Sequence, residues 1–460
     1  MAQTLTLDSL QAAFRGPLVS PGDPDYDGAR RVWNAMVDKR PSVVARCTGP
    51  ADVVAAVNFA REHDLAIAVR GGAHSAAGKG TCDDGIVIDL SLMKGVRVDP
   101  GSRTVRAQGG VTWGQFDHET QAFGLAAPGG VVSTTGISGL TLGGGFGWLT
   151  RRFGLSCDNL VSVDVVTAGG EQIVANVDEH PDLFWALRGG GGNFGIATSF
   201  EYELHPVGPV ILGGLVGWPL ARAAEILAFH REQTRGVPDE LGISAAFVTA
   251  PPLPFVPDAL QFQPAIVVIF CWSGDLDQGQ DVLRPWLDLA PPIQMVAQLP
   301  YTVMQSIQDE LAPPGRHSYW KAGYLAELTD DAIAAVVDVA AGVPSPFSLA
   351  EMVLWGGAVA RVGDDDTAFG QRDGRFLFNA VSMWEDPSAT GANVAWARAF
   401  HDALQPYASG GVYVNFLSEE GPERVAAAYG PEKFGRLSRI KAQYDPDNVF
   451  RLNQNIPPAR

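Results

Sequence analysis

The sequence has few of the residues that mark a metal-binding or disulfide-stabilised protein. It holds only four cysteines, Cys47, Cys82, Cys157 and Cys271. They show no CxxC spacing, and no histidine lies at the spacing of a zinc ligand. We therefore expect reduced cysteines in a cytoplasmic protein, and no metal site.

Basic charge and long apolar runs are also scarce. Lysine and arginine total 33 against 51 aspartates and glutamates, which gives a net charge of −18 at pH 7. This balance argues against nucleic acid or an anionic membrane as a partner, because both attract basic surfaces. The absence of any run of about 18 apolar residues predicts no membrane span. Residues 1–14 lack a basic stretch followed by an apolar one, so we expect no signal peptide.

Glycine, by contrast, is abundant and unevenly placed. The chain has 460 residues, more than one hydrophobic core usually serves, which predicts at least two domains. Of its 53 glycines, many fall between Gly71 and Gly195. This clustering predicts a binding site rather than a flexible linker.

The first glycine-rich stretch, Val69–Gly78, reads VRGGAHSAAG and follows a strand expected at Leu65–Arg70. Glycines at the end of a strand let the backbone approach a ligand closely. The N–H groups of such a turn suit a pyrophosphate, and His74 offers a side chain for covalent chemistry. Taken alone, the motif is also typical of a tight turn whose histidine only bonds to a neighbour.

Two further glycine-rich stretches follow, at Pro128–Leu160 and Gly189–Gly195. The first has neither helical nor strand periodicity, so we expect it to be irregular. Because irregular segments of this length are usually functional or disordered, its apolar residues favour wrapping around a ligand.

The pattern of expected helices and strands changes near Pro206. Before it, a helix expected at Pro50–Glu62 lies between two strands, and short strands and a capped helix follow. After it, strands alternate with longer helices, which predicts an α+β domain with an antiparallel sheet backed by helices. The expected strands are 211–216, 265–272, 349–355 and 376–384, and the expected helices are 219–233, 330–341 and 392–404.

Two nucleotide motifs match only in part. Gly190-x-Gly192-x-x-Gly195 fits the dinucleotide fingerprint by letter, but it follows a helix and precedes a strand. Gly78-Lys79 resembles the end of a P-loop, yet Gly80 stands where the magnesium-binding Ser or Thr is needed. Neither a Rossmann site nor a nucleotide hydrolase is therefore expected.

In combination, four motifs resemble the FAD-linked oxidases of the vanillyl-alcohol oxidase superfamily, and more closely their berberine-bridge-enzyme-like branch. They are RGGAHS at 70–75, the segment 129–147, LSCDN at 155–159 and GNFGIATSFEY at 192–202. The tail from Tyr413 to Asn455 agrees, so the resemblance covers nearly the whole chain.

The resemblance implies a PCMH-type FAD-binding domain split between residues 1–207 and 417–460, with a substrate-binding domain at 208–416. It implies FAD bonded covalently to His74. Many relatives add a second bond to a cysteine, at a position that falls here on Val132; one bond is therefore expected, and Cys157 lies too far downstream to replace it. The cofactor-binding residues implied are Arg70, Gly71, Gly72, Ala73, His74, Ser75, Thr135, Gly136, Gly139, Gly143, Gly144, Gly147, Asn159, Gly195, Ile196, Asn415, Asn453 and Asn455.

The resemblance also suggests catalytic and substrate-binding residues. Tyr413 matches a tyrosine that relatives place over the flavin, Thr135 would lie where O2 reacts, and Glu351 is a charge within an apolar strand. A core aromatic or a sheet-edge salt bridge would explain Tyr413 and Glu351 equally simply. Tyr319, Lys321 and Trp355 are the candidate substrate contacts. Trp320 is a further candidate for the pocket lining, and packing in an aromatic core would explain this group equally well.

The function implied is an O2-using oxidoreductase that takes a hydride from a small organic substrate. The pair Thr135-Gly136, Glu351 and the ending RLNQNIPP resemble the favorskiiase-type flavoenzymes of enterocin biosynthesis, which act on a polyketide and oxygenate through a flavin N5-oxide. A sugar or alcohol oxidase that releases hydrogen peroxide is the alternative, and a non-catalytic binding protein is a third. Relatives are often dimers, so a homodimer is also an expectation.

Overall fold

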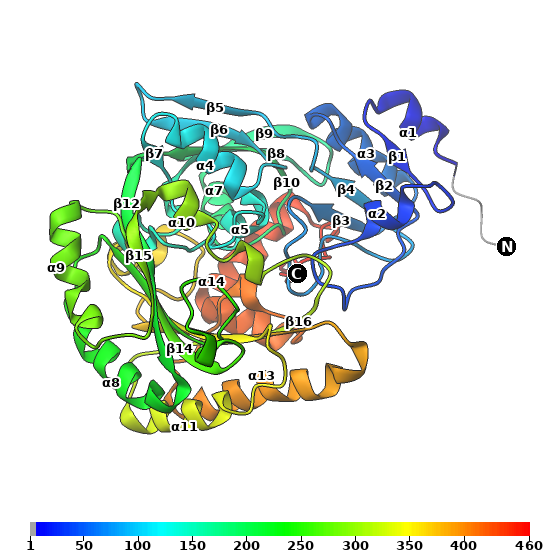
Figure 1. Ribbon diagram of the computed structural model, residues 1–460. Coiled ribbons are helices and arrows are strands. Elements are labelled where there is room, and N and C mark those ends of the chain that lie inside the picture. Colours follow the sequence, from blue (N-terminus) through cyan, green and yellow to red (C-terminus); the bar gives the residue numbers. More distant parts are fainter. Residues whose placement is uncertain (1–5) are drawn as a thin grey trace.

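The computed structural model describes residues 6–460 and builds three main sheets (Figure 1). The beginning and the end of the chain, blue and red in Figure 1, lie beside each other, and the middle of the chain forms the green and yellow sheet next to them. This mixed architecture confirms the predicted α+β class with an antiparallel sheet backed by helices.

The first sheet carries the histidine loop at the end of one of its strands. Its order is β1 (Leu18–Val19), β2 (Val43–Arg46), β4 (Ile86–Asp89) and β3 (Ile67–Arg70). The last three strands run parallel, and α3 (Pro50–Glu62) makes the crossover from β2 to β3, which lie on either side of β4. Because β3 ends at Arg70, residues 71–80 emerge from the carboxyl edge of the sheet, where α/β folds bind ligands.

The described chain before β2 contains two short helices, α1 (Asp8–Ala13) and α2 (Tyr26–Arg30), with β1 between them. The expectation of no signal peptide rests in part on residues 1–5, which lie outside the described residues. Within residues 6–460, no helix combines the length and apolar character needed to cross a membrane.

The second sheet is antiparallel and supports the other two glycine stretches. Its order is β5 (Val96–Asp99), β6 (Thr104–Gln108), β10 (Ile196–Glu203), β8 (Leu160–Val166) and β9 (Gln172–Ala175). Helix α4 (Trp113–Gln121) begins with the capping box of Thr112 and Gln115, and its apolar side packs on Tyr202. Helix α7 (Pro181–Leu187) leads into Gly189–Gly195.

The segment 128–160 is more regular than its sequence predicts. It contains α5 (Ile137–Leu142), α6 (Thr150–Phe153) and a 3-10 turn at Ser156–Asn159. The expectation of an irregular segment was therefore wrong for these residues. The short β7 (Leu125–Ala126), which precedes them, pairs with β11 (His205–Pro206) at the end of this part of the chain.

The third sheet has seven antiparallel strands, three of which border the site. Its order is β15 (Ile293–Pro300), β12 (Val210–Pro219), β14 (Pro264–Trp272), β13 (Leu241–Thr249), β17 (Leu349–Leu354), β18 (Phe376–Trp384) and β16 (His317–Leu325). Helices α8 (Ala223–Gln233), α9 (Leu276–Leu287), α11 (Asp330–Ala340) and α13 (Thr390–Leu404) cover one face, as Figure 1 shows. Even-numbered residues of β17 and β18, such as Met352 and Phe378, belong to the apolar core on this helical side. Odd-numbered residues therefore point to the other face.

Two short helices, α10 (Tyr301–Gln305) and α12 (Ala358–Arg361), connect strands of this sheet to neighbouring segments. After α13 the chain returns to the first part through a 3-10 turn at Val414–Phe416 and α14 (Pro422–Tyr444). The fully buried Lys441 pairs with Asp445 and donates to the carbonyl of Asn193, which ties α14 to the third glycine stretch. The limits 1–207, 208–416 and 417–460 stay predictions; the first boundary lies between β11 and β12.

Candidate active site

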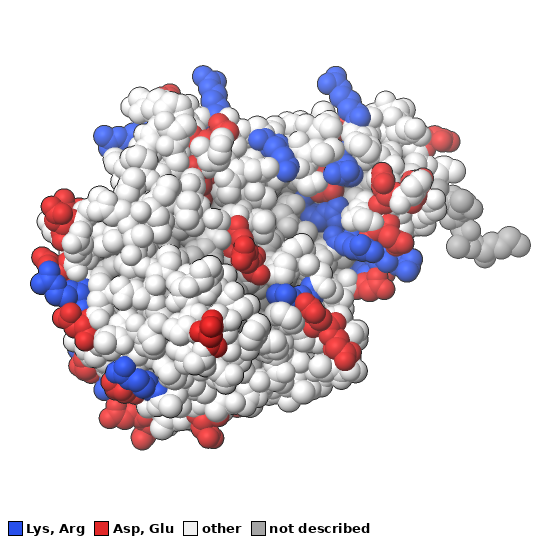
Figure 2. All heavy atoms as spheres, in the orientation of Figure 1, with Lys and Arg blue, Asp and Glu red and all other residues white. Residues whose placement is uncertain are grey.

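A cavity opens between the glycine-rich stretches and the free face of the seven-stranded sheet. Its volume is about 300 Å³. Ligand pockets typically hold roughly 300–1,000 Å³, so the cavity lies within the range of small-molecule binding sites. Figure 2 shows one side of the molecule, where charged side chains gather mainly along the edges and a few acidic and basic groups lie near the middle.

The first two glycine stretches touch through their backbones. A Cβ atom added to Gly72 would lie 2.2 Å from the amide nitrogen of Gly136, and one added to Gly136 would lie 2.3 Å from that of Gly72. Real Cβ contacts are never this short, so neither position tolerates a side chain. The contact brings the loop after β3 against the N-terminal end of α5, and both line the cavity.

His74 lies on the cavity wall, half-buried and held from two directions. Its ring stacks on Trp33, with centroids 5.3 Å apart and planes inclined by 24°. Its Nε2 lies 2.8 Å from the Thr134 hydroxyl. Nδ1 is the ring nitrogen that this contact does not use. Desolvation lowers the pKa of His74 to about 4, so the imidazole is neutral at pH 7 and keeps a lone pair for bond formation.

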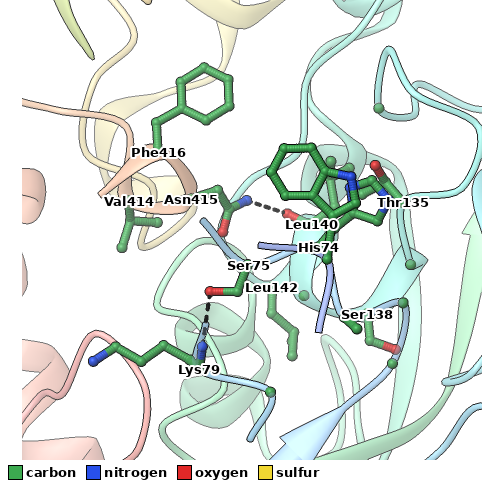
Figure 3. Close-up of a pocket in the computed structure, with 18 of the residues that line it drawn as sticks. His74, Ser75, Lys79, Thr135, Ser138, Leu140, Leu142, Val414, Asn415 and Phe416 are labelled. Carbon is green, nitrogen blue, oxygen red and sulfur yellow. Dashed lines mark hydrogen bonds between the residues drawn. The ribbon is translucent and has the colours of Figure 1, made fainter. Parts of the chain in front are cut away.

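Most residues implied by the resemblance come together on this wall, some of them drawn in Figure 3. Those that line the cavity are Arg70, Gly71, Gly72, Ala73, His74, Ser75, Thr135, Gly136, Gly139, Gly195, Ile196, Asn415 and Asn453. The remaining five, Gly143, Gly144, Gly147, Asn159 and Asn455, lie outside the lining. Asn159 holds the backbone of Phe153 and Leu155, a supporting role behind the wall. The roles of all these residues stay predictions.

The charged side chain of Arg70 bonds to other residues of the protein and does not point freely into the cavity. Its guanidinium pairs with Asp89 at 2.6 Å and donates to the carbonyl of Arg31. Anion binding at this loop therefore rests on backbone N–H groups rather than on a free guanidinium.

The wall carries no cysteine at the position that matters for a second bond. Val132 lines the cavity, whereas Cys157 is fully buried elsewhere. Burial raises the pKa of the Cys157 thiol, an environment typical of an inert cysteine.

The facing wall is the free side of the sheet, and Glu351 is its acidic group. Its lining residues alternate along the strands, as the register requires: Leu349 and Glu351 on β17, and Asn379, Val381 and Met383 on β18. Glu351 is 8% exposed and lies directly across from Asn379. Burial raises the pKa of Glu351 to about 7, and a hydrogen bond from Asn379 opposes that rise. The Oδ1 of Asn379 has no partner among residues 6–460.

Tyr413 and Asn415 come from the returning segment and close one end of the cavity. The Tyr413 hydroxyl accepts hydrogen bonds from the Gly145 N–H and the Asn415 side-chain amide, both at 2.9 Å. The same amide donates to the carbonyl of Leu140, as Figure 3 shows. Burial raises the pKa of Tyr413, so it is a neutral phenol at pH 7, and its own proton is not used in either bond.

Of the three predicted substrate contacts, none lines this cavity. Tyr319 and Lys321 are on β16, but their side chains bond to Arg398 and Glu420 on the other side of the sheet. Trp320, which lies between these two residues in β16, lines the cavity. Trp355 lines a small neighbouring cavity that also touches Glu351.

Of the residues predicted from the sequence to line the pocket on β16, Trp320 does so, but several other lining residues were not predicted. An aromatic series runs from Trp33 to Trp320 and Phe416, with neighbouring centroids 6.0 and 5.1 Å apart. Asn379 and Ser138 also line the cavity, and so do Gln308 and Ala312 of the segment after α10. Isolated tryptophans and amides carry no sequence signal, because contacts between distant segments bring them here.

Comparisons with known proteins agree with this geometry. Residues 41–176 match the family of FAD binding domains, and residues 412–457 match the berberine and berberine-like family. The chain is 33% identical over 454 residues to an FAD-linked oxidoreductase of Dictyostelium discoideum, covering 97% of this chain and 96% of the relative. It belongs to the berberine-bridge-enzyme-like FAD-linked oxidoreductases.

Other relatives extend the match to an oxidase and to solved folds. The chain is 30% identical over 459 residues to the (R)-6-hydroxynicotine oxidase of Paenarthrobacter nicotinovorans, covering 97% of each chain. The crystal structure of 6-hydroxy-D-nicotine oxidase from Arthrobacter nicotinovorans superposes with a TM-score of 0.88 at 29% identity, covering 99% of this chain and 100% of that one. The protein is thus an FAD-dependent oxidase. The narrower resemblance to the favorskiiase type stays a prediction.

The residues present fit FAD. Gly72 and Gly136 keep the wall free of side chains, and the cavity continues past Gly192 and Asn453 toward the returning segment. The Tyr429 hydroxyl lines the same cavity and has no hydrogen-bond partner among the described residues, so a ligand can use it. Within residues 6–460, no group of three or more His, Cys, Asp or Glu side chains is placed to hold a metal ion.

Proposed function

We propose that this oxidase carries FAD joined by a single covalent bond to His74. We further propose that it oxidises a small, largely apolar organic substrate, such as a polyketide or another secondary metabolite, and passes the electrons to O2. The observation that carries the proposal is the pairing of two walls across one cavity. A neutral histidine stands on the cofactor side and a buried carboxyl, Glu351, on the sheet side.

FAD supplies the hydride acceptor and the reactivity toward O2. Glu351 supplies the proton chemistry: a carboxyl with a pKa of about 7 exchanges a proton near neutral pH, as a general base must. As a base it accepts the proton of a substrate O–H or N–H when the neighbouring C–H bond is broken. Tyr413 offers its phenolic proton to a substrate oxygen at the other end of the site.

The sheet wall favours an apolar substrate over a sugar. Beside Glu351 and Asn379, its lining consists of Leu349, Val381, Met383 and Trp320. A sugar presents a hydroxyl on almost every carbon, and leaving these unpaired against apolar side chains is costly. The alternative of a sugar or alcohol oxidase is therefore less well supported for sugars than for aromatic or aliphatic alcohols.

Oxygen transfer to the product, the chemistry of the favorskiiase type, is the second candidate. Thr135 supports oxygen transfer, because this residue lines the cavity beside the contact between Gly72 and Gly136. A non-catalytic protein would have no need of a buried carboxyl facing the cofactor wall.

The test is a turnover screen with isotope labelling. The purified protein is supplied under ¹⁸O2 with aryl alcohols, enolisable polyketide mimics, glucose and xylobiose, and hydrogen peroxide is measured. We expect peroxide with the apolar substrates, a rate lower by at least 100-fold in Glu351→Gln, and unlabelled product. Label in the product would support oxygen transfer, whereas peroxide from the sugars alone would contradict the proposed substrate class.

A further inference from the structure

Both groups that hold the His74 ring are tied by hydrogen bonds to one segment that also borders the cavity. This segment, residues 309–315, follows α10 and belongs to the predicted substrate-binding domain. It reaches the histidine by two separate routes.

The first route passes through the turn that carries Thr134. The Asp309 carboxylate accepts from the backbone N–H of Ser133 at 2.8 Å and also from the Ser133 hydroxyl. The next residue, Thr134, bonds to Nε2 of His74. Gln305, one turn earlier, donates to the carbonyl of Gly130 and holds the other end of the same stretch.

The second route passes through Trp33, whose ring stacks on the imidazole. Its indole N–H donates to the carbonyl of Ala312 at 2.9 Å. Its backbone carbonyl accepts from Gly315 at 3.0 Å, and its backbone N–H donates to the carbonyl of Ala73, beside His74. The same segment therefore fixes both the face of the ring and one of its nitrogens.

We infer that residues 309–315 form a clamp that positions His74 for attachment of FAD, with Asp309 as the principal positioning residue. The inference rests on the proposed covalent bond to His74. It adds that attachment depends on contact between the substrate-binding domain and the FAD-binding domain. A polypeptide whose two parts have not yet docked would hold FAD without forming the bond.

The attachment step balances with O2 as the oxidant. One C–N bond forms between the imidazole of His74 and the 8α methyl carbon of the flavin. One C–H bond of that methyl group and the N–H bond of the imidazole are lost. The two protons and two electrons released reduce O2 to hydrogen peroxide. Because a bond-forming pair must be held near 3–3.5 Å in the right orientation, a displacement of about 1 Å can slow such a step by about 100-fold.

The experiment compares covalent and total FAD in the full-length protein. The protein is expressed under riboflavin limitation and supplied with FAD, and samples are precipitated with acid over time. Asp309→Ala and Trp33→Phe should slow attachment at least tenfold while total bound FAD stays at the wild-type level. Trp33→Phe keeps an aromatic ring on His74 but removes the bond to Ala312.

Two matched variants separate positioning from folding. Asp309→Asn keeps an acceptor for the Ser133 N–H and should attach FAD at nearly the wild-type rate. Glu310→Gln alters the exposed neighbour of Asp309 and should change nothing. Wild-type attachment in Asp309→Ala, or a loss of covalent FAD only in step with total FAD, would overturn the inference. A wild-type protein that never forms the bond would contradict the proposed function as well.

Discussion

Glu351 and Asn379 are direct neighbours across strands β17 and β18, on the cavity face of the sheet. The carboxyl is almost fully buried, and the amide beside it is the polar group that moderates its pKa. This pair places a titratable group in an otherwise apolar wall. The proposed role of Glu351 in proton transfer rests on this pair, and the buried carboxyl also implies a cost in stability.

The stability cost has a defined pH dependence. Glu351 has a pKa of about 7 in the folded protein against an ordinary value of 4.5. The folded state therefore binds more protons than the unfolded state between these values, and stability falls as pH rises from about 4.5 to 7. The full effect is about 3 kcal/mol. We expect Glu351→Gln to melt at a higher temperature than wild type at pH 8, with a smaller difference at pH 5.5. Equal melting temperatures at both pH values would show that the carboxyl is not buried in its charged form.

Tyr413→Phe removes an acceptor from two buried donors. The N–H of Gly145 and the amide of Asn415 both bond to its hydroxyl. Leaving a buried donor unsatisfied costs roughly 1–3 kcal/mol, so the variant should be less stable and turn over more slowly. Its FAD content should stay unchanged, because other residues line the cofactor wall. Thermal melts, flavin absorbance and peroxide release check the three expectations, and unchanged turnover would remove Tyr413 from the catalytic residues.

Gly72→Ala tests the contact between the glycine stretches. The new methyl group would lie 2.2 Å from the amide nitrogen of Gly136, so one segment must move. We expect loss of most bound FAD, measured as the flavin-to-protein absorbance ratio. Gly391→Ala is the matched control, because nothing lies within 4 Å of its added Cβ. Full FAD occupancy in Gly72→Ala would mean that the two stretches separate easily.

Val132→Cys tests the predicted absence of a second bond. Val132 lines the cavity, and the sequence resemblance predicts that a second covalent bond would need a cysteine at this position. In the double variant His74→Ala/Val132→Cys, we expect acid-stable FAD to return through the new thiol. Cys157→Ser should leave attachment untouched, because that thiol is fully buried away from the cavity. Free FAD in the double variant would show that residue 132 is not within reach of the cofactor.

Local patterns in the sequence were enough to predict several elements. The helix at Pro50–Glu62 combines a proline in its first turn with helical apolar spacing, and the capping box of Thr112 and Gln115 marks the start of α4. Such signals act within one turn, so they can be recognised without knowing which distant segments pack against the helix. The helix Ile137–Leu142 was missed, because its small and hydroxyl residues blur the apolar period.

Two features were harder to predict: which residues of a strand face the cavity, and which distant segments contact each other. Tyr319 and Lys321 were expected at the substrate, but a strand turns alternate residues to opposite faces, and Trp320 takes the cavity side. Trp33 stacks on His74, and Asp309 bonds to Ser133 next to Thr134, although both lie far from His74 in the sequence. Nothing in their immediate sequence distinguishes them from ordinary surface or core residues.

The central claim is the single covalent bond between FAD and His74, and acid precipitation tests it most directly. The purified wild-type protein, His74→Ala and Cys157→Ser are precipitated, and the visible spectra of pellet and supernatant are recorded. The account predicts yellow pellets for the wild type and Cys157→Ser, and a yellow supernatant for His74→Ala. A yellow supernatant from the wild type, or a yellow pellet from His74→Ala, would contradict it.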